Sequence, residues 1–283
     1  MLNDEQISEA DMLDIEKLYR FSDESEEPLE RLLDDGGFTS IFRKIGCVGD
    51  SLSSGELESM TPDGVRGYHD YYDISWGQFM ARITGATVYN FSRGGMRADE
   101  YCKSFADSRG FWASDLRCDA YVIALGVNDV SKYGKELGDP ESDIDLSCWR
   151  NNKETFVGYY AMIIQRLREI EPKSRIFLMT IPRSGGVSEE KAQAYDLHRE
   201  ILYKLAEKFE FTYVIDLRKY APYYDNEFGK KFFLGGHMNA MGYLFTARMV
   251  ISYIDYIIRH NMDDFVQSGF IGKGGVYNSS RKW

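Results

Sequence analysis

The chain has 283 residues, of which 43% are hydrophobic, and its formal net charge is −11. This length suits one α/β domain with embellishments, and the apolar fraction excludes a wholly disordered chain. An acidic protein repels phosphate backbones and anionic lipid headgroups, so we expect neither nucleic acid nor a membrane as its partner.

The first 37 residues differ from the rest, because Asp and Glu are concentrated there and a short helical apolar pattern follows Ser8. We expect an acidic helical arm over residues 1–37, either a solvated segment or a docking segment for a partner or a second subunit. The sequence therefore leaves open whether the chain forms a homo-oligomer.

The first residues lack the pattern of a secretory signal, and no apolar run reaches the ~20 residues of a membrane span. A cytoplasmic location is the resulting expectation.

Strand and helix patterns alternate over residues 38–262, the predicted main domain, and residues 263–283 remain as a C-terminal tail. Apolar and β-branched runs predict strands, and apolar residues with helical spacing after a capping residue predict helices. In chain order we expect a strand over 41–48, a helix over 75–83, strands over 87–91 and 119–125, a helix opened by residues 151–154, a strand over 175–181, a helix over 188–209, a strand over 211–217 and a helix over 239–260.

This alternation predicts a parallel sheet with helices on both faces, whose ligands bind beyond the carboxyl ends of the strands. The segment between residues 52 and 75 is expected to be a long loop that borders this edge.

Three of the predicted strands end in polar turn residues. Ser51 follows the first strand, the pair Gly94-Gly95 follows the strand over 87–91, and Asn128 follows the strand over 119–125. A serine held at a rigid sheet edge can act as a nucleophile, while backbone N–H groups and an Asn amide can stabilise an oxyanion. Taken singly, each feature has another explanation: Ser51 can cap a helix, and the Gly and Asn residues can form ordinary turns.

His237 is the candidate base among the four histidines. It follows Gly235-Gly236 and precedes the last predicted helix, which Asn239 is expected to cap. His198 falls within an amphipathic helix and His260 at a helix C-terminus, where a cation suits the helix dipole.

The motifs around Ser51, Gly95, Asn128 and His237, in this order, resemble those of the SGNH (GDSL-type) esterase and lipase family over about residues 41–255. The resemblance implies that Ser51 is the nucleophile and His237 its base. It also implies that the backbone N–H groups of Ser51 and Gly95 and the side chain of Asn128 stabilise the oxyanion. The family fold is an α/β fold, a flavodoxin-like three-layer α/β/α sandwich with a five-stranded parallel sheet.

One position departs from the family pattern. The family places an Asp three residues before the histidine, whereas this chain has Leu234 there. Three explanations stay open: a backbone carbonyl orients His237, a carboxylate from elsewhere such as Asp225 or Glu227 does so, or the protein has lost most of its activity.

The sequence thus predicts a serine esterase that cleaves a short acyl ester, with carbohydrate acetyl groups suggested by the family, through an acyl-enzyme at Ser51. Asp50, Tyr68 and His69 are expected to contact this small-molecule or carbohydrate substrate, although the aromatic segment can also simply pack on the domain. One alternative is a binding protein that keeps the fold without turnover. Another is a nucleotide-binding flavodoxin-like domain, in which Asn128 and His237 would have no evident role. We expect no metal and no cofactor, because neither metal-ligand spacing nor a Walker lysine is present. Four cysteines without CxxC spacing predict free thiols.

Overall fold

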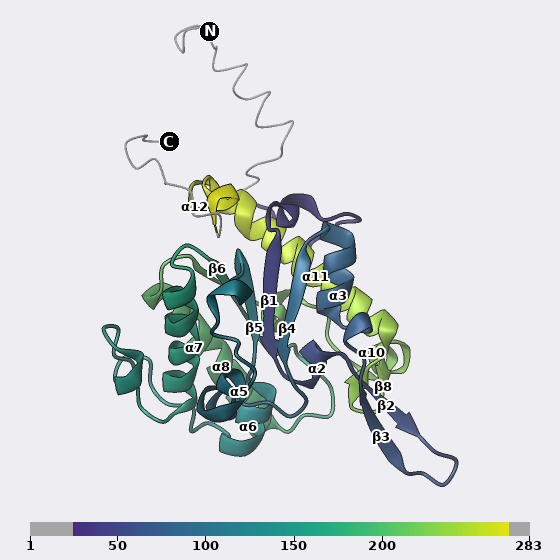
Figure 1. Cartoon of the computed structure of the whole chain (residues 1–283). Coiled ribbons are helices and arrows are strands. Elements are labelled where there is room, and N and C mark those ends of the chain that lie inside the picture. Colours follow the sequence, from purple (N-terminus) through teal and green to yellow (C-terminus); the bar gives the residue numbers. More distant parts are fainter. Residues whose placement is uncertain (1–24, 272–283) are drawn as a thin grey trace, which may run out of the picture.

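A five-stranded parallel sheet lies at the centre of the computed structural model, which describes residues 25–271 (Figure 1). The strand order is β4-β1-β5-β6-β7, and every neighbouring pair is parallel. The strands are β1 (Lys44–Gly49), β4 (Thr87–Ser92), β5 (Ala120–Ala124), β6 (Arg175–Met179) and β7 (Thr212–Ile215). The predicted five-stranded parallel sheet is confirmed.

Helices cover both faces of this sheet (Figure 1). One apolar core joins a face of the sheet to α3 (Trp76–Thr84) and α11 (Ala240–His260). A second core joins the opposite face to α7 (Phe156–Ile170) and α8 (Glu189–Lys208). These two cores confirm the predicted three-layer α/β/α sandwich.

The remaining elements are short and lie mostly in the connections between strands and long helices. The short α-helices are α2 (Ser51–Ser54), α4 (Ala98–Glu100), α5 (Ala106–Ser108), α6 (Val127–Tyr133), α9 (Leu217–Tyr220), α10 (Asn226–Phe232) and α12 (Met262–Phe265). Segment η4 (Tyr101–Phe105) is π-helical. The 3-10 segments are η2 (Gly37–Ile41), η3 (Tyr72–Ile74), η5 (Ser114–Leu116), η6 (Trp149–Asn151) and η7 (Ser268–Phe270). A two-residue pair, β8 (Phe233–Leu234) and β9 (His237–Met238), precedes α11.

The prediction of a loop between residues 52 and 75 is wrong. An antiparallel hairpin, β2 (Glu56–Met60) and β3 (Arg66–Asp70), occupies most of this segment and projects from the body of the molecule (Figure 1). Its turn is closed by the hydrogen bond from the Gly64 N–H to the Thr61 carbonyl, with Gly64 at φ +80°. Both faces of the hairpin carry polar strand residues, so the regular alternation of apolar and polar residues that marks a strand is missing from the sequence.

Most predicted helix starts agree with the structure, but one does not. The side chains of Ser75, Ser188 and Asn239 each accept a hydrogen bond from a first-turn N–H group, as the sequence predicts for capping residues. The cap of α7 is Thr155 rather than a residue of the 151–154 segment. Asn152 is buried instead and donates to the Gly158 carbonyl.

The predicted terminal segments are described only in part. The helix expected after Ser8 and residues 272–283 lie outside the described residues. Residues 25–36 contain no helix or strand and pack against α11. There Glu26 forms an ion pair with Arg259, and the Leu33 N–H donates to Ser252 Oγ.

Cys47, Cys102, Cys118 and Cys148 are free thiols, as expected. Within residues 25–271, the structure contains no helix that is long and apolar enough to cross a membrane.

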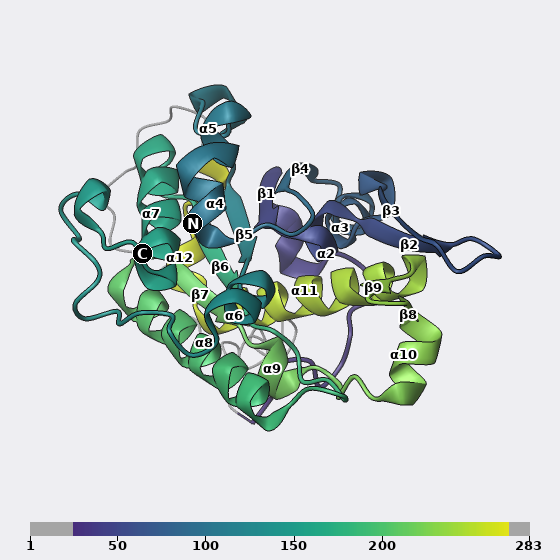
Figure 2. The same ribbon diagram turned by 90° about the horizontal axis from the view of Figure 1, so that it is seen from below.

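The position of β1 in the sheet determines where the polar turns meet. The last residue of β1, Gly49, pairs with Ser92 of β4 on one side and with Ala124 of β5 on the other. The segments that leave these three strands therefore start side by side at one edge of the sheet, which faces the viewer in Figure 2. Ligands of parallel α/β sheets bind at this edge.

Candidate active site

Ser51 lies at the sharp turn between β1 and α2. Asp50 is the N-cap of this short helix, and its Oδ1 accepts a hydrogen bond from the Leu52 N–H at 3.1 Å. Ser51 is therefore the first residue of the helix rather than its cap. Gly49 allows the turn to be tight, because a Cβ atom on this residue would lie 2.2 Å from Ser53 Oγ. The half-buried Ser51 side chain is thus held by the backbone on both sides.

The glycine pair after β4 lies next to Ser51. A Cβ atom on Gly94 would lie 4.0 Å from Ser51 Cβ, so a larger residue at this position would fill the space beside the serine. Gly95 has a φ of +69°, a conformation that favours glycine, and the turn after β4 depends on it. Gly95 remains the predicted donor of a backbone N–H group to the oxyanion.

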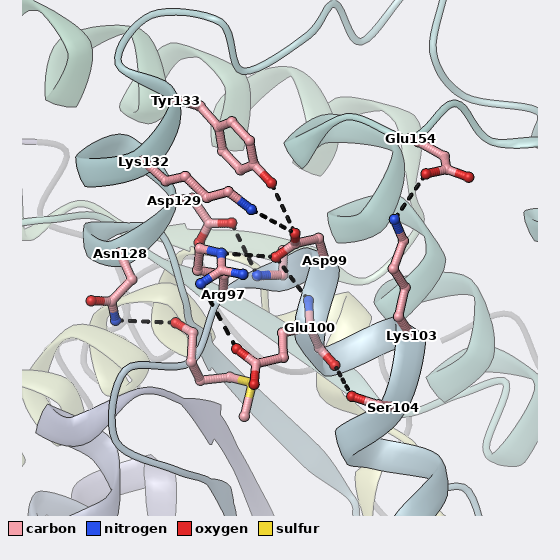
Figure 3. Close-up of polar contacts among 12 residues, drawn as sticks. Arg97, Asp99, Glu100, Lys103, Ser104, Asn128, Asp129, Lys132, Tyr133 and Glu154 are labelled. Carbon is pink, nitrogen blue, oxygen red and sulfur yellow. Dashed lines mark hydrogen bonds and ion pairs between the residues drawn. The ribbon is translucent and has the colours of Figure 1, made fainter.

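Asn128 and Asp129 connect the turn after β5 to the turn after β4 (Figure 3). Asn128 Nδ2 donates to the Met96 carbonyl at 3.1 Å and lies 3.3 Å from Asp50 Oδ2. Asp129 Oδ1 accepts from the Ala98 N–H at 3.0 Å. The structure therefore brings Ser51, the glycine turn and Asn128 into one site, as the sequence predicts.

A charged cluster beside these turns reinforces the same connection. Asp99 accepts hydrogen bonds from Arg97, Lys132 and the Tyr133 hydroxyl, which joins α4 to α6 (Figure 3). These contacts together hold the pKa of Asp99 below its ordinary value, although its burial acts in the opposite direction.

His237 lies in β9, and its ring is oriented by a carboxylate that the sequence analysis did not find. His237 Nδ1 lies 2.7 Å from Glu58 Oε1 in β2, and the Gly236 N–H donates to the same oxygen at 2.8 Å. Burial disfavours the charge of Glu58, but the hydrogen bonds from His237 and Gly236 outweigh it and lower the pKa of Glu58. Glu58 thus supplies a carboxylate acceptor to His237 Nδ1.

A carboxylate from elsewhere in the chain thus contacts the His237 ring, but it comes from neither of the two named candidates. Asp225 caps α10 by accepting from the Phe228 N–H, and Glu227 pairs with Lys230. Leu234 faces His237 in the β8–β9 pair, and 46% of its surface is exposed.

Two signals in the sequence are consistent with the position of Glu58, although neither identifies its contact with His237. Glu56 and Glu58 are two residues apart, as side chains on one face of a strand are, and they follow Ser51 closely. The second signal is Gly235-Gly236, since a Cβ atom on Gly235 would lie 2.0 Å from Glu58 Oε2. These glycines allow the carboxylate to approach the backbone beside His237.

Glu56 contacts the other ring nitrogen of the histidine. Glu56 Oε1 lies 3.1 Å from His237 Nε2, and among residues 25–271 no hydrogen bond joins this nitrogen to Ser51. Burial raises the pKa of Glu56, the charges of Asp70 and Glu58 raise it further, and His237 opposes the shift. Asp50, at the base of the site, has its pKa raised to about 6, chiefly by burial.

The hairpin places Tyr68 and His69 on opposite faces, because they are consecutive residues of β3. The Tyr68 ring lies edge-on to His237 with a centroid distance of 5.9 Å. His69 bonds to Ser59 Oγ at 2.8 Å and stacks on Tyr71. The structure thus brings Tyr68 to the site and does not bring His69 there.

The remaining two histidines have structural surroundings. His198 is fully buried, its Nε2 lies 3.1 Å from the Leu125 carbonyl, and burial lowers its pKa to about 4. His260 Nδ1 lies 2.8 Å from the Tyr256 carbonyl at the end of α11. His237 is therefore the histidine that faces the polar turns.

A cavity of about 680 Å³ opens beside Ser51, Asn128 and His237. Its lining includes Leu52, Val127 and Met238, the sequence neighbours of Ser51, Asn128 and His237. A cavity of this volume accommodates a small organic molecule.

In the described part of the chain, no group of three or more His, Cys, Asp or Glu side chains is arranged to hold a metal ion.

The fold and this arrangement of residues define a class of protein, the hydrolases of ester bonds. The chain belongs to the GDSL-like lipase/acylhydrolase family, whose model matches residues 47–244. The predicted resemblance is thereby confirmed. Comparison with curated proteins gives no significant match.

Two solved structures illustrate the shared fold. One is a carbohydrate esterase family 2 enzyme plus carbohydrate binding domain from Corynascus thermopiles (Myceliophthora fergusii), with 15% identity and a TM-score of 0.53 over 76% of this chain and 66% of that one. The other is an active site mutant of a family two carbohydrate esterase from Clostridium thermocellum, with 17% identity and a TM-score of 0.50 over 84% of this chain and 66% of that one. At these identities the likeness shows the fold.

The role of Glu58 can be tested by removing its charge. We expect Glu58→Gln to lower kcat for p-nitrophenyl acetate by roughly 10²- to 10⁴-fold with little change in KM. In the serine-protease triad, loss of the carboxylate that orients the histidine lowers kcat by ~10⁴-fold. Leu234→Asp is expected to change kcat by less than about threefold, because Nδ1 already has its acceptor. Glu227→Gln serves as the control. A small effect of Glu58→Gln combined with a large gain from Leu234→Asp would contradict this assignment.

Asp129 provides a pH-dependent prediction. It is fully buried, its Oδ2 has no hydrogen-bond partner within the described residues, and burial raises its pKa from 3.8 to about 7. The folded state therefore favours the protonated carboxyl, and this stabilisation is present below about pH 4 and lost as the pH rises towards about 7. We expect the Tm of Asp129→Asn, relative to wild type, to increase between about pH 4 and pH 8 in thermal unfolding. The exposed substitution Asp63→Asn should show no such trend, and a constant difference for Asp129→Asn would refute the prediction.

Proposed function

We propose that this hydrolase cleaves short-chain acyl esters through a covalent acyl-enzyme at Ser51, with His237 as the general base. The observation that carries the proposal is the 2.7 Å contact between Glu58 Oε1 and His237 Nδ1. An ionised carboxylate at Nδ1 favours the tautomer with the proton on that nitrogen, so that Nε2 is the nitrogen that accepts a proton. The same carboxylate stabilises the imidazolium that forms when Nε2 does so.

In the proposed first step, Ser51 Oγ attacks the ester carbonyl carbon while its proton moves to His237 Nε2. The electron pair of the carbonyl moves to its oxygen, where the N–H groups of Ser51 and Gly95 and the amide of Asn128 stabilise the charge. When the tetrahedral intermediate collapses, the bond to the alcohol breaks and the alcohol takes the proton from His237. A water molecule then repeats the sequence on the acyl-enzyme and releases the carboxylic acid.

A carbohydrate is the proposed alcohol part of the substrate, and acetyl is the proposed acyl part. The two solved structures of similar fold are described as carbohydrate esterases. The exposed aromatic ring of Tyr68 beside His237 suits contact with a sugar ring, and the buried carboxylate of Asp50 is the other proposed contact. The neighbouring cavity of about 680 Å³ has room for a sugar unit.

The nucleophile and the base can be tested together. A fluorophosphonate probe should label Ser51 and add its mass to the intact protein, and Ser51→Ala should abolish labelling. We expect His237→Ala to lower the hydrolysis of p-nitrophenyl acetate by roughly 10³-fold or more. His260→Ala, which removes a histidine of the opposite end of α11, should retain activity within about twofold.

A folded wild-type protein that the probe does not label would overturn the proposed mechanism. That result would favour the alternative, a binding protein that keeps the fold, and the contact of Glu56 with His237 Nε2 is the observation in its favour.

A further inference from the structure

Glu56 lies where the proposed chemistry takes place. Its Oε1 is 3.1 Å from His237 Nε2, the nitrogen that has to accept the Ser51 proton. Its Oε2 lies over the glycine turn, because a Cβ atom on Gly94 would be 2.3 Å from it and 4.0 Å from Ser51 Cβ. The carboxylate thus occupies the space between the base and the glycine turn, next to the nucleophile.

This contact is incompatible with catalysis in its present form. At 3.1 Å, Glu56 Oε1 occupies the space next to Nε2 that the Ser51 hydroxyl has to enter in order to donate its proton. While the Glu56 carboxylate is there, Nε2 cannot form the hydrogen bond with Ser51. Glu56 therefore has to leave Nε2 before the first step of the proposed mechanism.

The backbone of Glu56 is fixed, whereas its carboxylate is weakly held. The Tyr243 hydroxyl donates to the Glu56 carbonyl at 2.6 Å, and Glu56 pairs with Asp70 across the hairpin. In the described part of the chain, the contact that holds the Glu56 carboxylate is the one with His237, and no Lys or Arg pairs with it. Glu58 differs, because Gly236 and Arg66 also contact its carboxylate. A competing hydrogen-bond donor can therefore displace the Glu56 carboxylate and leave Glu58 in place.

We propose that Glu56 is a specificity-determining residue that recognises a free hydroxyl group next to the scissile ester. The hydroxyl donates to the Glu56 carboxylate and draws it from His237 Nε2. Once the carboxylate has moved away, the space next to Nε2 is open and Ser51 can donate its proton to that nitrogen. The substrate class is then the partly acylated polyol, such as a sugar with a free hydroxyl beside its ester. This inference rests on the proposed function.

The test compares two acetyl esters of similar size, 2-hydroxyethyl acetate and 2-methoxyethyl acetate, with acetate release followed in a pH-stat. The first carries the neighbouring donor and the second does not. We expect wild-type kcat/KM to be roughly 10- to 100-fold higher for the hydroxy ester, the range for a hydrogen bond to a charged group. In Glu56→Ala the ratio should fall to within about threefold of one, because removal of the carboxylate frees Nε2 and raises the activity on the methoxy ester.

Two further variants keep the test decisive. Glu56→Gln preserves the shape of the side chain and removes its charge, so its ratio should fall well below the wild-type value even if Glu56→Ala is unstable. Ser59→Ala changes the same strand on the face turned away from His237, and its ratio should equal that of the wild type.

Three outcomes would overturn the inference. The first is an unchanged ratio of kcat/KM for the two esters in both active Glu56 variants. The second is loss of activity on both esters in variants that fold. The third is a wild-type preference for acetylcholine over the hydroxy ester, which would show recognition of charge. Failure of the proposed function itself looks different, because Ser51 would then remain unlabelled by the fluorophosphonate probe and the wild type would cleave neither ester.

Discussion

The hydrogen bond between Glu58 and His237 is the interaction on which the rest of the site depends. It joins residues that are 179 positions apart in the chain, one in the hairpin after α2 and one in the short β9 strand before α11. Figure 2 shows β2 beside β8 and β9, on the side of the molecule where α2 follows β1. The hairpin is therefore a part of the site, and its attachment to the domain sets the orientation of the imidazole ring.

The same hydrogen bond explains why two glycines precede His237. Any side chain on Gly235 would collide with the Glu58 carboxylate, and the Gly236 N–H donates to it. In the family pattern the orienting carboxylate comes from the chain segment of the histidine itself. Here the carboxylate that contacts the ring comes from β2, and the two glycines leave room for it beside the histidine. A leucine at position 234 is compatible with this arrangement, because Nδ1 has its acceptor in Glu58.

Much of the fold follows from the sequence, because its core strands are short apolar runs and its long helices have recognisable caps. The convergence of Ser51, Gly95 and Asn128 was also predictable, since each follows a strand of one parallel sheet and β1 lies between β4 and β5. Glu58 could not be placed in the same way. The β2–β3 hairpin has polar residues on both faces, and the partner that gives one face its role lies in a distant loop. A pattern that depends on local apolar periodicity contains no information about such a contact.

The two glutamates of β2 show how one strand can supply two different functions around a single ring. Their spacing of two residues puts both on the face of the hairpin that meets His237. Glu58 is held by Gly236 and Arg66 as well as by the ring, and its pKa is lowered, so it stays ionised and in place. Glu56 has no such support, and burial together with the nearby charges of Asp70 and Glu58 raises its pKa. A carboxylate that is both weakly held and unfavourably charged is the one that a substrate can displace. The asymmetry of the two environments, rather than any difference in residue type, therefore separates the residue that orients the base from the residue that we propose selects the substrate.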